Sequence, residues 1–189
     1  MGDRGLDAVI LGASGFVAKY ILREFMRHLE RADGQGRRRI GIAGHNREKL
    51  AKALQWAAQG ALQMPLLIPV IEAGVMDSAS MAALCKRTQL IVNYVGPFCL
   101  YGESVVAAYV EAGIDYLDIT GEQKFMEMME EHYHSLALLT GSLIISTPVP
   151  MIMLPPTSVS YFIAGSGSHC SCLTAWMRMW FWSLRSELC

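Results

Sequence analysis

The chain has 189 residues, of which 52% are hydrophobic and 17% are charged, and its formal net charge is −1. This length suits one large domain, and the mean hydropathy of +0.29 excludes a largely disordered chain. The balanced charge excludes the basic surface of a nucleic-acid-binding protein, and no apolar run is long enough for a transmembrane helix. Five sparse cysteines favour a reducing, intracellular and cytoplasmic location over a disulfide framework.

Short apolar runs alternate with amphipathic patterns through residues 1–146. In chain order, the predicted elements are a strand over 7–11, a helix over 15–31, a strand over 39–43, a helix over 47–58, a strand over 65–71, a helix over 78–86, a strand over 89–93, a helix over 102–112, a strand over 115–119, a helix over 122–139 and a strand over 142–145. This alternation predicts an α/β fold with a doubly wound parallel sheet, a Rossmann domain. Such sheets bind ligands beyond the carboxyl ends of their strands, where the candidate residues should lie.

A glycine-rich turn, Gly12-Ala13-Ser14-Gly15-Phe16, joins the first strand to the first helix. Gly12 permits a tight turn, and Gly15 lets backbone N–H groups approach a phosphate at the helix N-terminus. Strand, turn, helix and second strand follow in the order that dinucleotide binding requires. The alternative is a glycine turn that binds nothing.

The end of the second strand bears on the choice of cofactor. An acidic residue there would bind the ribose of NAD, whereas this chain has His45, Asn46 and Arg47. Arg47 suits the 2′-phosphate of NADP, so NADP is the predicted cofactor and NAD the alternative. Equally, Arg47 is placed where a solvated residue of a helix's first turn would lie, and Asn46 where its N-cap would lie.

Two further loops follow the fourth and fifth strands. Asn93, Gly96 and Pro97 would lie under the nicotinamide ribose, or would form a plain strand-to-helix turn. The stretch from Asp118 to Glu122 either lines a substrate pocket or caps the helix that follows it. Glu103 is expected in the first turn of the helix predicted over 102–112.

No pattern identifies a catalytic residue. The chain lacks a Tyr-x-x-x-Lys pair and a nucleophile elbow. His132 and His134 are two residues apart on a predicted helix, so they do not share a face, and we expect no metal site.

The motifs together resemble the saccharopine dehydrogenase-like oxidoreductase family, which includes trans-acting enoyl reductases. The resemblance covers residues 7–146 and is carried by the segments 9–16, 43–50, 93–98, 101–103 and 118–122. It implies an NAD(P)-binding Rossmann domain followed by a larger domain for a small-molecule substrate and dimer contacts. It also implies a link to lipid metabolism, with peripheral association with membranes or lipid droplets. His45 departs from the family, which often has Arg there.

The composition changes at residue 147. Residues 147–189 hold only three of the 33 charged side chains, and we expect this tail to be atypical and poorly ordered. A reading-frame shift near Thr147 would explain it, because the shifted codons of Met151 and Ile152 must encode an Asp at the spacing of a family turn. The stretch 176–182, which contains three Trp and one Phe, would otherwise form an interfacial anchor. The coding DNA would distinguish a reading-frame shift from a natural tail of this kind.

Three functions are therefore open. The chain is the cofactor-binding part of an oxidoreductase whose full-length parent transfers hydride to a lipid-related substrate, a non-catalytic NADP-binding module, or a non-functional truncated product. A hydride-transfer assay separates the first from the others.

Overall fold

The computed structural model describes residues 5–31, 39–59 and 68–146, with side chains described up to residue 26 in the first range. The predicted tail of residues 147–189 lies outside these ranges. Six strands and five helices alternate within them: β1 (Leu6–Leu11), α1 (Phe16–Arg31), β2 (Ile40–Gly44), α2 (Arg47–Ala57), β3 (Val70–Glu72), α3 (Ser78–Cys85), β4 (Thr88–Asn93), α4 (Phe98–Ala112), β5 (Asp115–Asp118), α5 (Gln123–Thr140) and β6 (Ile144–Ser146).

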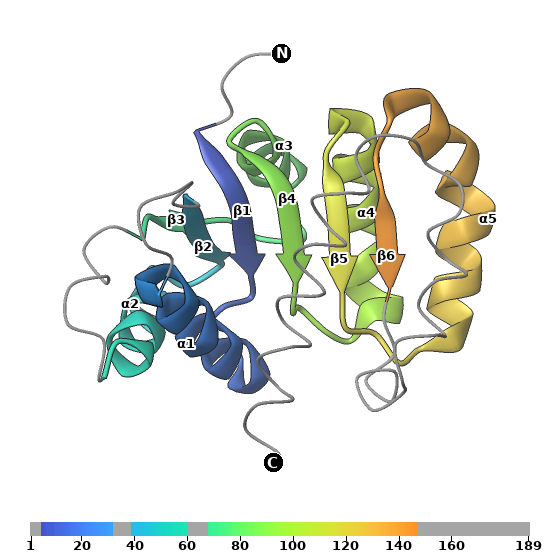
Figure 1. Cartoon of the computed structure of the whole chain (residues 1–189). Helices are drawn as coiled ribbons and strands as arrows, with labels where there is room; N and C mark the ends of the chain where they lie inside the picture. The colour runs from blue at the N-terminus through green and yellow to red at the C-terminus, as the bar shows by residue number, and fades with distance from the viewer. Residues whose placement is uncertain (1–4, 32–38, 60–67, 147–189) are drawn as a thin grey trace. The chain divides into compact units, whose positions relative to one another are not determined.

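The strands form one parallel sheet in the order β3-β2-β1-β4-β5-β6. The order reverses between β1 and β4, which makes the sheet doubly wound and confirms the predicted Rossmann fold. Figure 1 shows α1 and α2 in front of the sheet, α3 and α4 behind it, and α5 beside α4. The carboxyl ends of the strands, at the arrowheads, all lie along one edge.

The core is built around β1, which lies between β2 and β4 and is covered by helices on both faces. Val9, Ile10 and Leu11 are fully buried, as the continuous apolar run predicts for a central parallel strand. Behind the sheet, Tyr109 of α4 packs on Tyr116 of β5, with ring centroids 5.5 Å apart. This apolar packing fixes the helices that frame the carboxyl edge.

The helix ends follow local signals in most cases. Asn46 caps α2 by accepting from the Lys49 N–H, and Asp77 caps α3 by accepting from Ala79 and Ser80. Gly113 and Gly141 end α4 and α5 in the left-handed conformation. Within the described ranges, no helix is both long and apolar enough to cross a bilayer.

Two predicted boundaries are wrong. The helix predicted over 102–112 begins one turn earlier, at Phe98, so Glu103 lies beyond the first turn. The strand predicted over 65–71 is described as β3, Val70–Glu72, while residues 60–67 lie outside the described ranges. Pro69 precedes β3 and still contributes its carbonyl, which accepts from the Ile42 N–H.

Helices α4 and α5 pack tightly against each other at Gly102. A Cβ atom at Gly102 would lie 2.5 Å from Cε2 and Cζ of Phe125, whose side chain is fully buried. The buried ring has little space to move into, so this position requires glycine although the residue lies inside a helix.

We therefore expect Gly102→Ala to lower the free energy of unfolding by roughly 1–3 kcal/mol, because overpacking outweighs the helix propensity of alanine. Urea denaturation measures the change. Gly121→Ala is the matched control, since nothing lies within 4 Å of its added Cβ. Equal stability of the two variants, or a gain from Gly102→Ala, would contradict the packing constraint.

Candidate functional site

The glycine-rich turn after β1 is held between two neighbouring strands. Gly12 has a φ of +77°, and its N–H donates to the Ala43 carbonyl over 2.8 Å. A Cβ there would lie 2.7 Å from Cγ2 of Val95 and 3.2 Å from the Tyr94 backbone. Both the conformation and the space therefore require glycine, as a close approach of backbone to a ligand also does.

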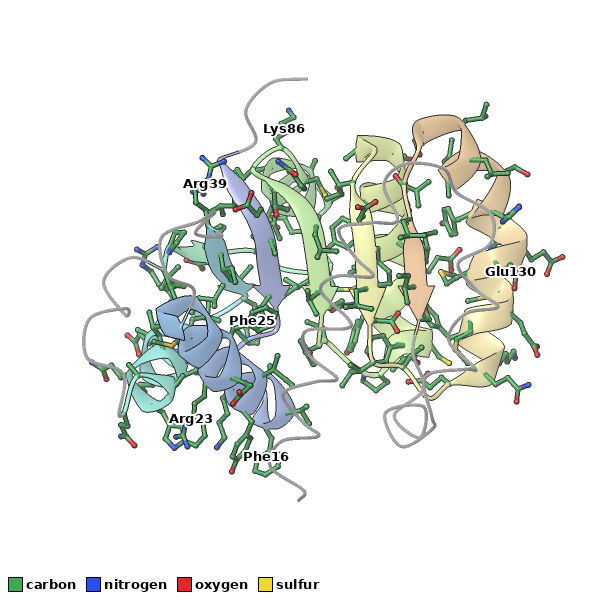
Figure 2. The ribbon with its side chains drawn as sticks, viewed as in Figure 1. Phe16, Arg23, Phe25, Arg39, Lys86 and Glu130 are labelled. Carbon is green, nitrogen blue, oxygen red and sulfur yellow. The ribbon has the colours of Figure 1, made fainter. Side chains whose placement is uncertain are left out.

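The N-terminus of α1 opens directly from this turn. The Gly15 N–H donates to the Gly12 carbonyl over 2.9 Å, and Ala13 is fully buried. The Phe16 side chain is 73% exposed and extends away from the sheet at the carboxyl edge (Figure 2). The first turn of α1 contains no acidic residue. Its first N–H groups have no partners inside the helix, so this end of α1 suits an anion.

The three candidate residues after β2 lie beside the glycine-rich turn, because Ala43 pairs with Leu11. Asn46 uses its side-chain oxygen to cap α2. Arg47 is exposed, and its Nη1 donates to the Val70 carbonyl over 3.3 Å, while His45 is exposed. The exposed Arg47 guanidinium is thus the strongest candidate for a phosphate contact at this end of the edge.

The loop after β4 is fixed by Asn93, whose side chain is fully buried. Its Oδ1 accepts from the Val95 N–H over 2.9 Å, and its Nδ2 donates to the Tyr116 hydroxyl over 3.1 Å. Gly96 and Pro97, joined by a cis peptide bond, are exposed. Asn93 therefore shapes the loop from inside, whereas Gly96 and Pro97 form its surface.

Asp118 lies at the end of β5 and is buried. Its Oδ1 accepts from the Thr120 N–H over 2.9 Å, and its Oδ2 accepts from the Ser146 hydroxyl over 3.0 Å. Burial raises the pKa of Asp118, although hydrogen bonds from Thr120, Tyr116 and Ser146 oppose the shift. This carboxyl group is embedded in the sheet edge and does not line a surface.

Glu122 bridges the loops that follow β5 and β4. Its two carboxylate oxygens accept from the N–H groups of Phe98 and Cys99 over 2.9 and 2.8 Å. Hydrogen bonds from Cys99 and Phe98 hold the pKa of Glu122 below its ordinary value. Glu122 was predicted to cap its own helix or to line a pocket. Its side chain instead caps α4, which explains why that helix begins at Phe98.

The N-termini of α1 and α4 consequently differ. Neither helix has an acidic residue in its own first turn. The first backbone donors of α4 nevertheless bind the Glu122 carboxylate, whereas no described side chain accepts from the first N–H groups of α1. Of these two helix ends at the carboxyl edge, only that of α1 is suited to a phosphate.

Sequence reasoning missed three contributors to this edge: Val95, Tyr116 and Ser146. Each acts through a contact with a residue from another strand or loop, so no local motif marks it. Away from the edge, His132 of α5 lies 3.5 Å from the Glu103 carboxylate of α4. The described ranges contain no cluster of three or more His, Cys, Asp or Glu side chains arranged to hold a metal ion.

Comparison with known proteins adds three findings. Residues 8–145 match the family model of the saccharopine dehydrogenase NADP binding domain. A protein of Arabidopsis thaliana named as a saccharopine dehydrogenase-like oxidoreductase is 44% identical over 140 residues, covering 74% of this chain and 31% of the relative. The lipid droplet localized protein of Caenorhabditis elegans is 33% identical over 140 residues, covering 74% and 32%. The chain thus spans about a third of the length of these relatives.

The fold also matches a solved structure. Apo saccharopine dehydrogenase (L-Glu forming) from Saccharomyces cerevisiae superimposes with a TM-score of 0.54 at 11% identity, over 75% of this chain and 27% of that one. At this identity the likeness supports the fold alone.

The Glu122 cap should make stability depend on pH. Because the pKa of Glu122 lies below its ordinary value of 4.5, its stabilisation is complete above that pH and is lost as the pH falls through the lowered pKa. We expect the Tm of the wild type to exceed that of Glu122→Gln from about pH 5 to 7, and the difference to vanish in stronger acid.

Thermal unfolding of both proteins across this range measures the difference. The raised pKa of Asp118 acts in the opposite direction, since its contribution is lost as the pH rises. Burial, the main cause of that shift, is common to both proteins, whereas the smaller part caused by the charge of Glu122 is absent from Glu122→Gln. Glu130→Gln is the control, because Glu130 extends outward from α5 (Figure 2). A Tm difference that stays constant into acid would show that the charge on Glu122 does not stabilise α4.

Proposed function

The chain belongs to the saccharopine dehydrogenase NADP-binding domain family, and from this premise we propose that NADP(H) binds along the carboxyl edge of its sheet. The observation that carries the proposal is the tight turn at Gly12, where a Cβ would clash with Val95, directly before the N-terminus of α1, whose first turn has no acidic residue. The residues present therefore fit a dinucleotide. When bound, NADPH supplies a hydride, and the residues of this edge bind and orient it.

The pyrophosphate would lie at the glycine-rich turn. Gly12, Ala13 and Gly15 would shape the turn, because their N–H groups donate to the carbonyls of Ala43 and Gly12. The N–H groups of Ser14 and Phe16 would bind the pyrophosphate at the start of α1. The small Ala18, only 1% exposed, supports this placement because it lets α1 pack closely on the sheet.

The adenosine end would lie over β2. Arg47 would bind the 2′-phosphate, with His45 beside it, while Asn46 would hold the start of α2 in place. The Arg47 guanidinium donates to the Val70 carbonyl over 3.3 Å, which is a contact that a phosphate would readily replace. The absence of an acidic side chain at residues 44–47 supports NADP over NAD.

The nicotinamide end would lie over the loop after β4. Gly96 and Pro97 would contact it directly, and Asn93 would act from beneath through the hydrogen bond that it accepts from Val95. A dinucleotide spans the point where strand order reverses, so the β4 side of β1 takes the second nucleotide.

The reaction of the whole protein is a further part of the proposal. We infer an NAD(P)-dependent oxidoreductase that transfers hydride to a small-molecule substrate, with this domain as its cofactor-binding part. We propose an intracellular location, cytoplasmic or at a lipid droplet surface. The name of the Caenorhabditis elegans relative supports the lipid droplet, whereas the Arabidopsis thaliana relative is named as a probable mitochondrial oxidoreductase. The alternative is an NADP-binding module without turnover, favoured by the absence of an assigned proton donor at the described edge.

Titration of the chain with NADPH and NADH, followed by thermal shift or calorimetry, tests the proposal. We expect saturable binding that is stronger for NADPH, and about tenfold weaker NADPH binding in Arg47→Met with NADH binding unchanged. Lys52→Met removes another exposed cation from α2 and should leave the preference intact. If the folded protein binds neither dinucleotide, the proposed function is wrong; an unchanged preference in Arg47→Met would remove only the role of Arg47.

A further inference from the structure

The loop after β4 is held at both of its ends by side-chain hydrogen bonds. At its start, the Val95 N–H donates to Asn93 over 2.9 Å. At its end, the N–H groups of Phe98 and Cys99 donate to Glu122 over 2.9 and 2.8 Å. The exposed pair between them, Gly96 and Pro97, is therefore fixed from both sides.

Glu122 is itself fixed to the sheet. Its N–H donates to the Thr120 hydroxyl over 3.1 Å, and the Thr120 N–H donates to Asp118 over 2.9 Å. Asp118 is hydrogen-bonded to Tyr116, whose hydroxyl accepts from Asn93 over 3.1 Å.

The contacts from Asn93 through Tyr116, Asp118, Thr120 and Glu122 to Phe98 thus form a closed ring with the loop itself. Within the ring, Asn93, Tyr116, Asp118 and Thr120 are all buried. Among these hydrogen-bonded side chains, Glu122 is the one that is partly exposed. Its carboxylate closes the ring by joining the loop after β5 to the loop after β4. Removing its carboxylate opens the ring and leaves the buried hydrogen bonds in place.

The loop matters to the cofactor site because Val95 forms the wall beside Gly12. A Cβ at Gly12 would lie 2.7 Å from Val95 Cγ2 and 3.2 Å from the Val95 nitrogen. The loop after β4 therefore packs directly against the glycine-rich turn. A looser loop would release the β4 side of this turn, whereas the β2 side is held by the hydrogen bond from the Gly12 N–H to the Ala43 carbonyl.

We propose that Glu122 is a positioning residue for the nicotinamide half of the cofactor, holding the loop after β4 against the glycine-rich turn. This inference rests on the proposed binding of NADP(H). Glu122 acts through Phe98, Cys99 and Val95 and takes no part in chemistry. Loss of the Glu122 carboxylate should weaken the binding only of ligands that reach the β4 side of β1, where the strand order reverses.

The test compares two ligands on the full chain by calorimetry. NADPH spans both halves of the site, whereas 2′,5′-ADP carries only the adenosine half with its 2′-phosphate. We expect Glu122→Gln to bind NADPH about tenfold more weakly and 2′,5′-ADP within about twofold of the wild type. Glu122→Asp keeps the charge on a shorter side chain, so its affinity for NADPH should lie between those of the wild type and Glu122→Gln. Glu130→Gln, a matched change on the outside of α5, should bind both ligands normally.

The outcomes separate the two proposals. A wild type that binds neither ligand overturns the proposed function, and this inference with it. A wild type that binds both, with an unchanged Glu122→Gln, overturns the inference alone. An equal loss of both ligands in Glu122→Gln, including a loss through unfolding, also overturns it, because Glu122 would then support the whole domain.

Discussion

The register of the parallel sheet aligns the ends of five strands at its carboxyl edge. Leu11 pairs with Ala43 on one side and with Asn93 on the other, Asn93 pairs with Asp118, and Asp118 pairs with Ser146. These five residues stand at one level across five strands. The turns that follow them therefore start together, and a shift of one residue in any strand would separate the loops that meet there.

The polar part of this row is unusual for a sheet interior. Asn93 and Asp118 are fully buried, and each is satisfied by backbone or hydroxyl partners. Next to them, Glu122 is partly exposed and held in its charged form by two backbone donors. Burial and hydrogen bonding thus shift the pKa values of two neighbouring carboxyl groups in opposite directions, and the charge of Glu122 itself helps to raise that of Asp118.

Sequence reasoning predicted what depends on neighbours along the chain. The glycine-rich turn and the Asn46 cap are local, and the structure agrees with them. The family match likewise confirms the resemblance that these motifs carried. The start of α4 was predicted one turn late because its cap comes from residue 122, which is 24 positions from Phe98. The roles of Val95 and Tyr116 were not predicted from the sequence for the same reason, since both depend on contacts with residues of another strand or loop.

The distant cap of α4 also bears on how the chain is made. A ribosome releases residues 98 and 99 well before residue 122, so the first turn of α4 emerges with its N–H groups uncapped. The cap forms only after β5 has been synthesised and has paired with β4, which brings the loop of Glu122 into place. The complete capping of α4 therefore depends on formation of the β4–β5 pair.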